Sequence, residues 1–448
     1  MRIVLFNTSS RRFGDGSEVT YLPSRADDWD STAALFPEHE IIYVAVNLGL
    51  FWLDIKNNKV AIKPKNVRYV IVEDKATVEE IAELIISLNP SVAIASSVTG
   101  SYIDWNPIMD SLVAEVLEKR GVKTIWQKTS TSFACFDKWQ THLALRELGL
   151  NVAKAVFVDK KLFWKEKTDP AISINIYREY VLHRIKELTL PIIIKSTVGT
   201  GSIDMKIAES FEQAIEILND ESSANYDVIV EEFLQGEAFG TEIHGAMGNY
   251  HVLPPFSLSI NASGISDGHN NVKFGPVTNE KYKISKLQES LHRLAEAFGF
   301  VGSAQLDLVF YKDEWYIIEI NARYSGMTLT TAIAEGRSTF TIYVESLLGS
   351  PVDYSKMENL KYVVNFKIPA QDDETLSDIY AFPNVQAINQ YTIVNPGSEV
   401  PSKFCEVVFG RLDTKEELIE GLKALKKAFP EIISSTTVEE AEKLAKNG

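Results

Sequence analysis

The sequence lacks the features that mark secreted and membrane proteins. It has only two cysteines, Cys135 and Cys405, which lie far apart and in no CxxC or metal-ligand spacing. A reducing cytosol is therefore the simplest compartment. The first apolar stretch, Ile3–Phe6, is too short for a signal peptide, and the longest, Ile41–Leu53, is too short to span a bilayer. These absences predict a soluble, cytoplasmic protein.

Basic residues are also scarce, because 45 Lys and Arg stand against 61 Asp and Glu, for a formal net charge of −16. No block of basic residues occurs that would contact nucleic acid or a membrane surface. We interpret the excess of acidic residues as a solubility feature. The 448 residues, 45% of them hydrophobic, can bury several cores, which favours a multidomain globular protein.

Two motifs are missing: GxGxxG after the first apolar run and the Walker A loop. Dinucleotide binding therefore has little support. The N-terminal part of the chain instead alternates short apolar runs with amphipathic helices, which is typical of a parallel sheet wound with helices. The runs are Ile3–Phe6, Ile41–Val46, Tyr69–Val72, Val92–Ala95 and Val122–Trp126.

Further along, a run of large apolar side chains ends in polar residues at every second position. Successive side chains of a strand point to opposite faces. Five residues are therefore expected to share one face: Trp315, Ile317, Glu319, Asn321 and Arg323.

The preceding segment, SAQLDLVF, alternates as well and carries Asp307 on its polar face. If residues 312–314 form the loop of a hairpin, Asp307 pairs directly with Glu319. Opposed carboxylates repel each other, so we expect a divalent cation, Mg²⁺ or Mn²⁺, held by both acids and by the amide oxygen of Asn321. The alternative is a structural network in which Arg323 alone neutralises the acids.

A glycine-rich turn follows another apolar strand. Ile192–Ile194 delivers Lys195, and the backbone amides and hydroxyls of the following turn are suited to wrap phosphate oxygens. The turn residues are Gly199, Thr200, Gly201 and Ser202. The alternative is a plain hairpin without ligand contacts.

A third strand, Val228–Val230, ends in the acids Glu231 and Glu232. An edge strand with carboxylates and backbone groups beside an aromatic suits adenine and its ribose, whereas the alternative is a solvated strand end. Phe233, Leu234 and Glu237 come next. Lys138 lies in the first turn of a predicted helix, where the alternative is an exposed lysine.

Taken in order, these residues resemble the ATP-grasp superfamily, and the resemblance covers roughly residues 130 to 336. It implies a mixed α/β and α+β fold in three parts. A Rossmann-like domain over 1–130 would precede a two-subdomain ATP-grasp core over 131–355, with its lid at about 155–235. A small α+β domain would occupy 356–448.

The resemblance also implies the activity, which is an ATP- and Mg²⁺-dependent carboxylate–amine ligase that acts through an acyl phosphate. Phosphate contacts would come from Lys138, Lys195 and the 199–202 turn. Adenine would lie against 231–234, and Glu237 would bind the ribose. The metal would be held by Asp307, Glu319 and Asn321. Arg323 would stabilise the acyl phosphate and the oxyanion of the addition step.

The segment NARYSGM combines an Asn-x-Arg similar to that of biotin carboxylase, glycinamide ribonucleotide synthetase and the L-amino-acid ligases with an ending similar to that of D-alanine–D-alanine ligases. The C-terminal residues resemble the domain that biotin carboxylase and the L-amino-acid ligases add, which favours that branch. An amide or peptide bond between amino acids or small acids is therefore expected. A biotin-carboxylase-like bicarbonate-activating subunit and a non-catalytic ATP-binding regulator remain as alternatives, and a homodimer is compatible with the sequence. The polar loop 259–277 is interpreted as an active-site loop. Substrate contacts are expected from His269, Asn270, Lys273, Ser325 and Gly326, whereas His244 and His251 are assigned to a hairpin around Gly248.

Overall fold

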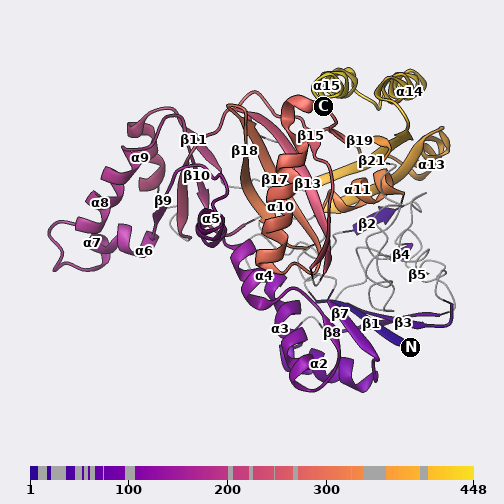
Figure 1. Cartoon of the computed structure of the whole chain (residues 1–448), viewed down its shortest axis with the longest axis horizontal. Coiled ribbons are helices and arrows are strands. Elements are labelled where there is room, and N and C mark those ends of the chain that lie inside the picture. Colours follow the sequence, from indigo (N-terminus) through magenta and orange to yellow (C-terminus); the bar gives the residue numbers. More distant parts are fainter. Residues whose placement is uncertain are drawn as a thin grey trace.

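The computed structural model describes residues 1–8, 18–21, 37–45, 53–54, 59–60, 66–73, 75–95, 106–199, 205–220, 226–246, 248–265, 271–323, 325–336, 360–393 and 402–448. Figure 1 shows an N-terminal sheet with its helices at the bottom, a helix-covered lid at the left and a large central sheet. No helix within these ranges combines the length and the apolar character needed to cross a membrane.

The N-terminal sheet has five parallel strands, which confirms the wound parallel sheet expected from the apolar runs. Helix α2 (Val78–Ser87) begins with a capping box formed by Thr77 and Glu80, and it packs on the sheet together with α3 (Asn106–Lys119). The strand order is β6 (Val67–Ile71), β3 (Glu40–Ala45), β1 (Arg2–Asn7), β7 (Val92–Ala95) and β8 (Thr124–Ile125). A separate antiparallel pair joins β4 (Leu53–Asp54) to β5 (Lys59–Val60).

Two short helices, α4 (Thr129–Phe136) and α5 (Lys138–Glu147), lead into the lid. The lid is a four-stranded antiparallel sheet whose aliphatic residues pack against α6 (Lys160–Phe163), α8 (Ile176–Ile185) and α9 (Phe211–Asn219). Its strand order is β11 (Lys206–Ala208), β10 (Ile192–Ser196), β12 (Val228–Glu232) and β9 (Ala155–Val158). The lid also contains α7 (Lys165–Thr168).

The central sheet has ten strands and joins the predicted core to the C-terminal segment. The order is β18 (Glu314–Asn321), β17 (Gly302–Tyr311), β13 (Glu237–Ala246), β15 (Phe256–Leu258), β16 (Lys273–Gly275), β19 (Tyr362–Pro369), β21 (Ser402–Leu412), β20 (Val385–Ile393) and β2 (Glu18–Tyr21), with β14 (Asn249–Val252) paired to β13. Because β16 pairs with β19, the predicted boundary at 355–356 falls between neighbouring strands of one sheet.

Helices cover both faces of this sheet. One face packs against α10 (Ile284–Phe298) and, farther along, against α13 (Asp373–Ala381), α14 (Lys415–Ala428) and α15 (Ser435–Asn447), through two large apolar clusters. The other face carries α11 (Thr328–Glu335) over a smaller apolar cluster. Side chains alternate along each strand. The second face therefore also receives the polar residues of β17 and β18.

The hairpin of β17 and β18 closes on two residues, not on the three predicted. Tyr311 pairs with Glu314, and the turn residues Lys312 and Asp313 have φ of 48° and 68°. Positive φ at both central residues is the requirement of the tight hairpin turn that matches strand twist. The predicted loop over 312–314 is therefore wrong by one residue.

A β-bulge corrects the register farther along the same hairpin. Leu308 pairs with Ile317 and Asp307 pairs with Glu319, so Ile318 is the extra residue. The predicted pairing of the two acids is confirmed. The predicted sharing of one face is wrong for Trp315 and Ile317, because the bulge turns both into the apolar cluster under α10, to which Ile320 and Ala322 also belong.

Candidate functional site

The acid pair is the centre of the site. Asp307 of β17 and Glu319 of β18 lie opposite each other on the face that carries α11. Burial and the neighbouring Glu319 charge raise the pKa of Asp307 to about 6. Burial alone would also raise the pKa of Glu319, but the charges of Lys138, Lys195 and Arg323 lower it below its ordinary value. One carboxylate is thus held ionised beside another that resists ionisation.

Gln305 orients the groups around the acids. Its Nε2 donates to Asp307 Oδ1 at 2.7 Å, and its Oε1 accepts from Asn321 Nδ2 at 2.8 Å. This arrangement leaves the amide oxygen of Asn321 as its remaining acceptor. No role was predicted for Gln305, although its position two residues before Asp307 puts both side chains on one face.

Lys138 connects the acid pair to the glycine-rich turn. The Asp137 side chain caps α5 by accepting from the Gln140 amide, which fixes Lys138 in the first turn as predicted. Lys138 Nζ lies 3.3 Å from Glu319 Oε1 and donates to the Gly199 carbonyl at 2.8 Å. The other predicted turn residues, Thr200, Gly201 and Ser202, lie outside the described residues.

Lys195 and Glu231 form a buried ion pair on neighbouring lid strands, with Nζ and Oε2 2.5 Å apart and only 5% and 11% of their side chains exposed. The structure therefore places the second predicted phosphate lysine beside the first predicted adenine-binding residue.

The end of β12 and the residue after it form hydrogen bonds with the backbone of the segment just before β10. Glu232 accepts from the Thr189 amide at 2.9 Å, and the Phe233 amide donates to the Pro191 carbonyl at 2.9 Å. The next backbone N–H after Phe233 is that of Leu234, and it donates to no other described residue.

Glu237 does not fit its predicted role as a ribose ligand. Its carboxylate accepts from the Tyr282 hydroxyl at 2.5 Å, and Lys281 Nζ lies 3.4 Å away. Along β13, Glu237 alternates in step with Phe239, which packs in the apolar cluster under α10. Glu237 therefore lies on the opposite face of the sheet from Asp307, and the prediction is corrected.

Arg323 follows Asn321 and is 7% exposed. Burial lowers its pKa, and the charges of Glu319 and Asp307 oppose that effect. Among the described residues its Nε finds no hydrogen-bond acceptor. A buried guanidinium with an unsatisfied donor next to two acids is a chemically suitable place for an anionic group.

The structure brings together two of the predicted substrate contacts. Lys273 Nζ donates to the Gly326 carbonyl at 3.0 Å and to Glu406 Oε1 at 3.3 Å. Ser325 instead donates through its hydroxyl to Glu242 at 3.2 Å. His269 and Asn270 lie outside the described residues.

The donor set suits a hard divalent cation. Two carboxylates and an amide oxygen are the ligand types that Mg²⁺ and Mn²⁺ prefer. A cation between Asp307 and Glu319 would remove the repulsion that raises the Asp307 pKa. In the part of the chain that the structure describes, no group of three or more His, Cys, Asp and Glu residues forms a metal site, so the amide of Asn321 is needed to complete the protein ligands.

The raised pKa of Asp307 has a measurable consequence for stability. The folded protein holds this proton up to about pH 6, whereas the unfolded chain releases it near the ordinary value of 3.8. The resulting stabilisation is present below about pH 4 and is lost as the pH rises through 6. Asp307→Asn should therefore increase the free energy of unfolding by about 3 kcal/mol at pH 7.5 without added metal, and by about half as much at pH 5.

Urea unfolding at both pH values measures this difference. Asp313→Asn is the matched control, because Asp313 lies on the same hairpin with 74% of its side chain exposed. An equal gain for Asp307→Asn at pH 5 and 7.5 would contradict the assignment.

The lid, β13, β17 and β18 fall within one segment of the chain that matches a known domain family. Residues 135–327 match the family model of the ATP-grasp domain. This match confirms the resemblance drawn from the sequence motifs.

Among curated proteins, carbamoyl-phosphate synthase of Methanobrevibacter smithii is 25% identical over 215 residues, which are 47% of this chain and 57% of that protein. D-alanine–D-alanine ligase of Buchnera aphidicola subsp. Schizaphis graminum is 25% identical over 248 residues, or 53% and 75% of the two chains. The match thus spans little more than half the length of the first of these relatives.

Among solved structures, an L-amino acid ligase from Bacillus licheniformis is similar along almost its whole length. The TM-score is 0.63 at 14% identity, and the similarity covers 95% of this chain and 97% of that one. A likeness at this identity establishes the shared fold, which includes the N-terminal sheet and the C-terminal segment.

Proposed function

We propose that this protein is an ATP- and Mg²⁺-dependent carboxylate–amine ligase. It would activate a small carboxylate as an acyl phosphate and pass the acyl group to an amine, most simply between two amino acids, with release of ADP and phosphate. The observation that carries this proposal is the buried Asp307–Glu319 pair flanked by Lys138 and Arg323. Carboxylates are poor electrophiles, so they must be activated before an amine can attack.

The cationic residues are placed to act on phosphate oxygens. Lys138 contacts both Glu319 and Gly199, the first residue of the glycine-rich turn. Lys195 lies on the lid strand β10, where it pairs with Glu231. Phosphoryl transfer is catalysed mainly by positioning and by cationic stabilisation, which these side chains supply. The Leu234 amide and the neighbouring strand edge would hold the adenine.

Asp307, Glu319 and the amide oxygen of Asn321 would hold Mg²⁺ or Mn²⁺. The cation neutralises charge on the phosphoryl group during transfer. Gln305 keeps Asp307 and Asn321 aimed at the same point. Arg323, with its unsatisfied Nε, would then bind the acyl phosphate and the oxyanion of the addition step.

Product analysis tests the proposal. Wild-type protein incubated with ATP, Mg²⁺ and mixed amino acids should yield ADP, phosphate and a new amide detectable by mass spectrometry. Hydroxylamine added during turnover should trap the activated acid as a hydroxamate. The control is the same mixture without amino acids, in which ADP release should stay at background.

Three other results would overturn the proposal. Stimulation by bicarbonate and biotin but by no amino acid would indicate the carboxylase alternative. AMP and pyrophosphate as products would exclude transfer of the terminal phosphate. Nucleotide binding without ADP release in any substrate pool would indicate a regulator.

A further inference from the structure

A buried charged cluster lies beside the acid pair on the same face of the sheet. On β13, Gly240 pairs with Asp307 and Glu242 pairs with Gln305, so Glu242 and His244 share the face of the acids. Both side chains are fully buried. The predicted hairpin is confirmed, because His244 pairs with His251, but no further role was predicted for either histidine.

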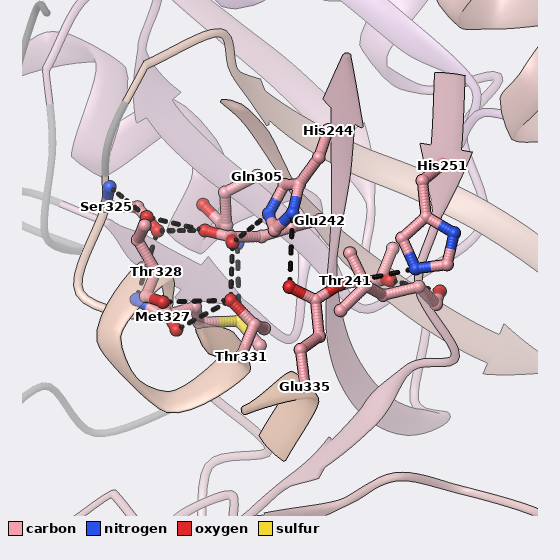
Figure 2. Close-up of polar contacts among 11 residues, drawn as sticks. Thr241, Glu242, His244, His251, Gln305, Ser325, Met327, Thr328, Thr331 and Glu335 are labelled. Carbon is pink, nitrogen blue, oxygen red and sulfur yellow. Dashed lines mark hydrogen bonds and ion pairs between the residues drawn. The ribbon is translucent and has the colours of Figure 1, made fainter. Parts of the chain in front are cut away.

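Glu242 gathers three hydroxyl groups from the segment that begins α11 (Figure 2). Its Oε1 accepts from Thr328 at 2.7 Å and from Ser325 at 3.2 Å, and its Oε2 accepts from Thr331 at 2.6 Å. Ser325 also accepts from the Met327 amide at 3.0 Å. One carboxylate therefore holds both the first turn of α11 and the residue Ser325 that precedes it.

His244 joins this carboxylate to a second one at the other end of α11. Its Nε2 lies 2.8 Å from Glu242 Oε2, and its Nδ1 lies 3.6 Å from Glu335 Oε2. Burial lowers the pKa of His244, but the two glutamates outweigh that effect and raise it to about 10. His251 approaches the same Glu335 at 3.2 Å. Burial would raise the pKa of Glu335, but His244 and His251 together outweigh that effect and lower it below its ordinary value.

Such a cluster is costly to bury, and an apolar contact would hold α11 to the sheet with less desolvation. The cluster instead holds the residues just before the helix in a defined position. Arg323 precedes Ser325 by two positions, and the Gly326 carbonyl receives Lys273. Met327 packs closely on Gly240 of β13, because a Cβ added at Gly240 would lie 2.4 Å from the Met327 sulfur. The same segment therefore also contacts β13.

We propose that Glu242 and His244 form a positioning pair that fixes Ser325 and Met327, and with them the nearby Arg323, so that the guanidinium meets the reacting phosphoryl group. Neither residue touches the reacting atoms. The proposal deepens the ligase assignment and rests on it for its catalytic meaning, although the structural clamp is testable without any turnover.

Hydrogen exchange measured by mass spectrometry tests the clamp directly. Glu242→Gln should speed exchange of the backbone amides from Ser325 to Thr331. Glu335→Gln is the matched control, since it removes a similarly buried charge from the same imidazole at the far end of α11. That variant should leave exchange at 325–328 close to wild type. Equal protection in Glu242→Gln and wild type would overturn the proposal.

Kinetics then distinguish positioning from general stability. Glu242→Gln should lower kcat by about 10- to 100-fold, the size of effect that small misplacements produce, while the KM for ATP changes by less than about threefold. Equal losses of kcat in Glu242→Gln and Glu335→Gln would contradict a role at the α11 entry. If wild type forms no amide, the ligase assignment fails, and the exchange experiment alone decides whether the clamp exists.

Discussion

Replacing Glu319 with Gln, or Asp307 with Asn, is expected to reduce ATP turnover by about 10³-fold or more while the fold stays intact. The two carboxylates are the charged protein ligands of the proposed cation, and a neutral amide binds a divalent ion much more weakly. Turnover is measured as ADP release in the presence of the substrate pair. Circular dichroism and a thermal melt show whether the fold is retained.

Glu237→Gln offers a matched control for these two variants. Glu237 is a carboxylate of the same sheet, but it lies on the face under α10 and binds Tyr282. Its replacement should change turnover by no more than about twofold. The metal assignment is wrong if Glu319→Gln and Asp307→Asn both keep wild-type activity, or if Glu237→Gln loses as much as they do.

Arg323→Ala should lower kcat by about 10²–10³, the range observed when one donor to a developing oxyanion is removed. The guanidinium is buried beside the acids, and its Nε has no hydrogen-bond partner among the residues that the structure describes, so it can act on negative charge that forms late in the reaction. Affinity for ATP should change little, because Lys138 and Lys195 remain. Isothermal titration gives the affinity, and steady-state kinetics gives kcat.

Arg323→Lys separates charge from geometry at this position. Lysine keeps the charge but loses the planar donor fork, so we expect an intermediate kcat. A loss of ATP affinity equal to the loss of kcat would show that Arg323 binds the nucleotide, and its proposed role in the addition step would be abandoned.

The sequence predicted the acid pair because two independent patterns converged on it. Period-two alternation placed Asp307 and Glu319 on the polar sides of two adjacent strands, and the short segment between them required a hairpin. The predicted pairing of Asp307 with Glu319 is correct although the turn is one residue shorter than predicted, because the bulge at Ile318 compensates for the shorter turn. The alternation of polar and apolar residues predicts neither the length of the turn nor the bulge.

Other parts of the site depend on contacts between distant segments. The same alternation would have placed Glu237 with Phe239 on the apolar side, but that reading requires knowing which face of β13 carries the site. The role of Glu242 was invisible for a similar reason. Its three hydroxyl donors lie more than 80 residues away in the chain. No local pattern reports such a juxtaposition.

The continuity of the central sheet bears on how a protein of this kind can change over evolution. The C-terminal strands join it through β16 and β19, in a register that sets Lys273 opposite Asn365. Replacing the C-terminal segment by that of a relative would have to reproduce this register, or β16 would become an unpaired edge open to aggregation. Glu406, which binds Lys273, would be exchanged in the same event. We therefore expect the segment to be retained together with the face that carries the acid pair, and not to be exchanged as an independent module.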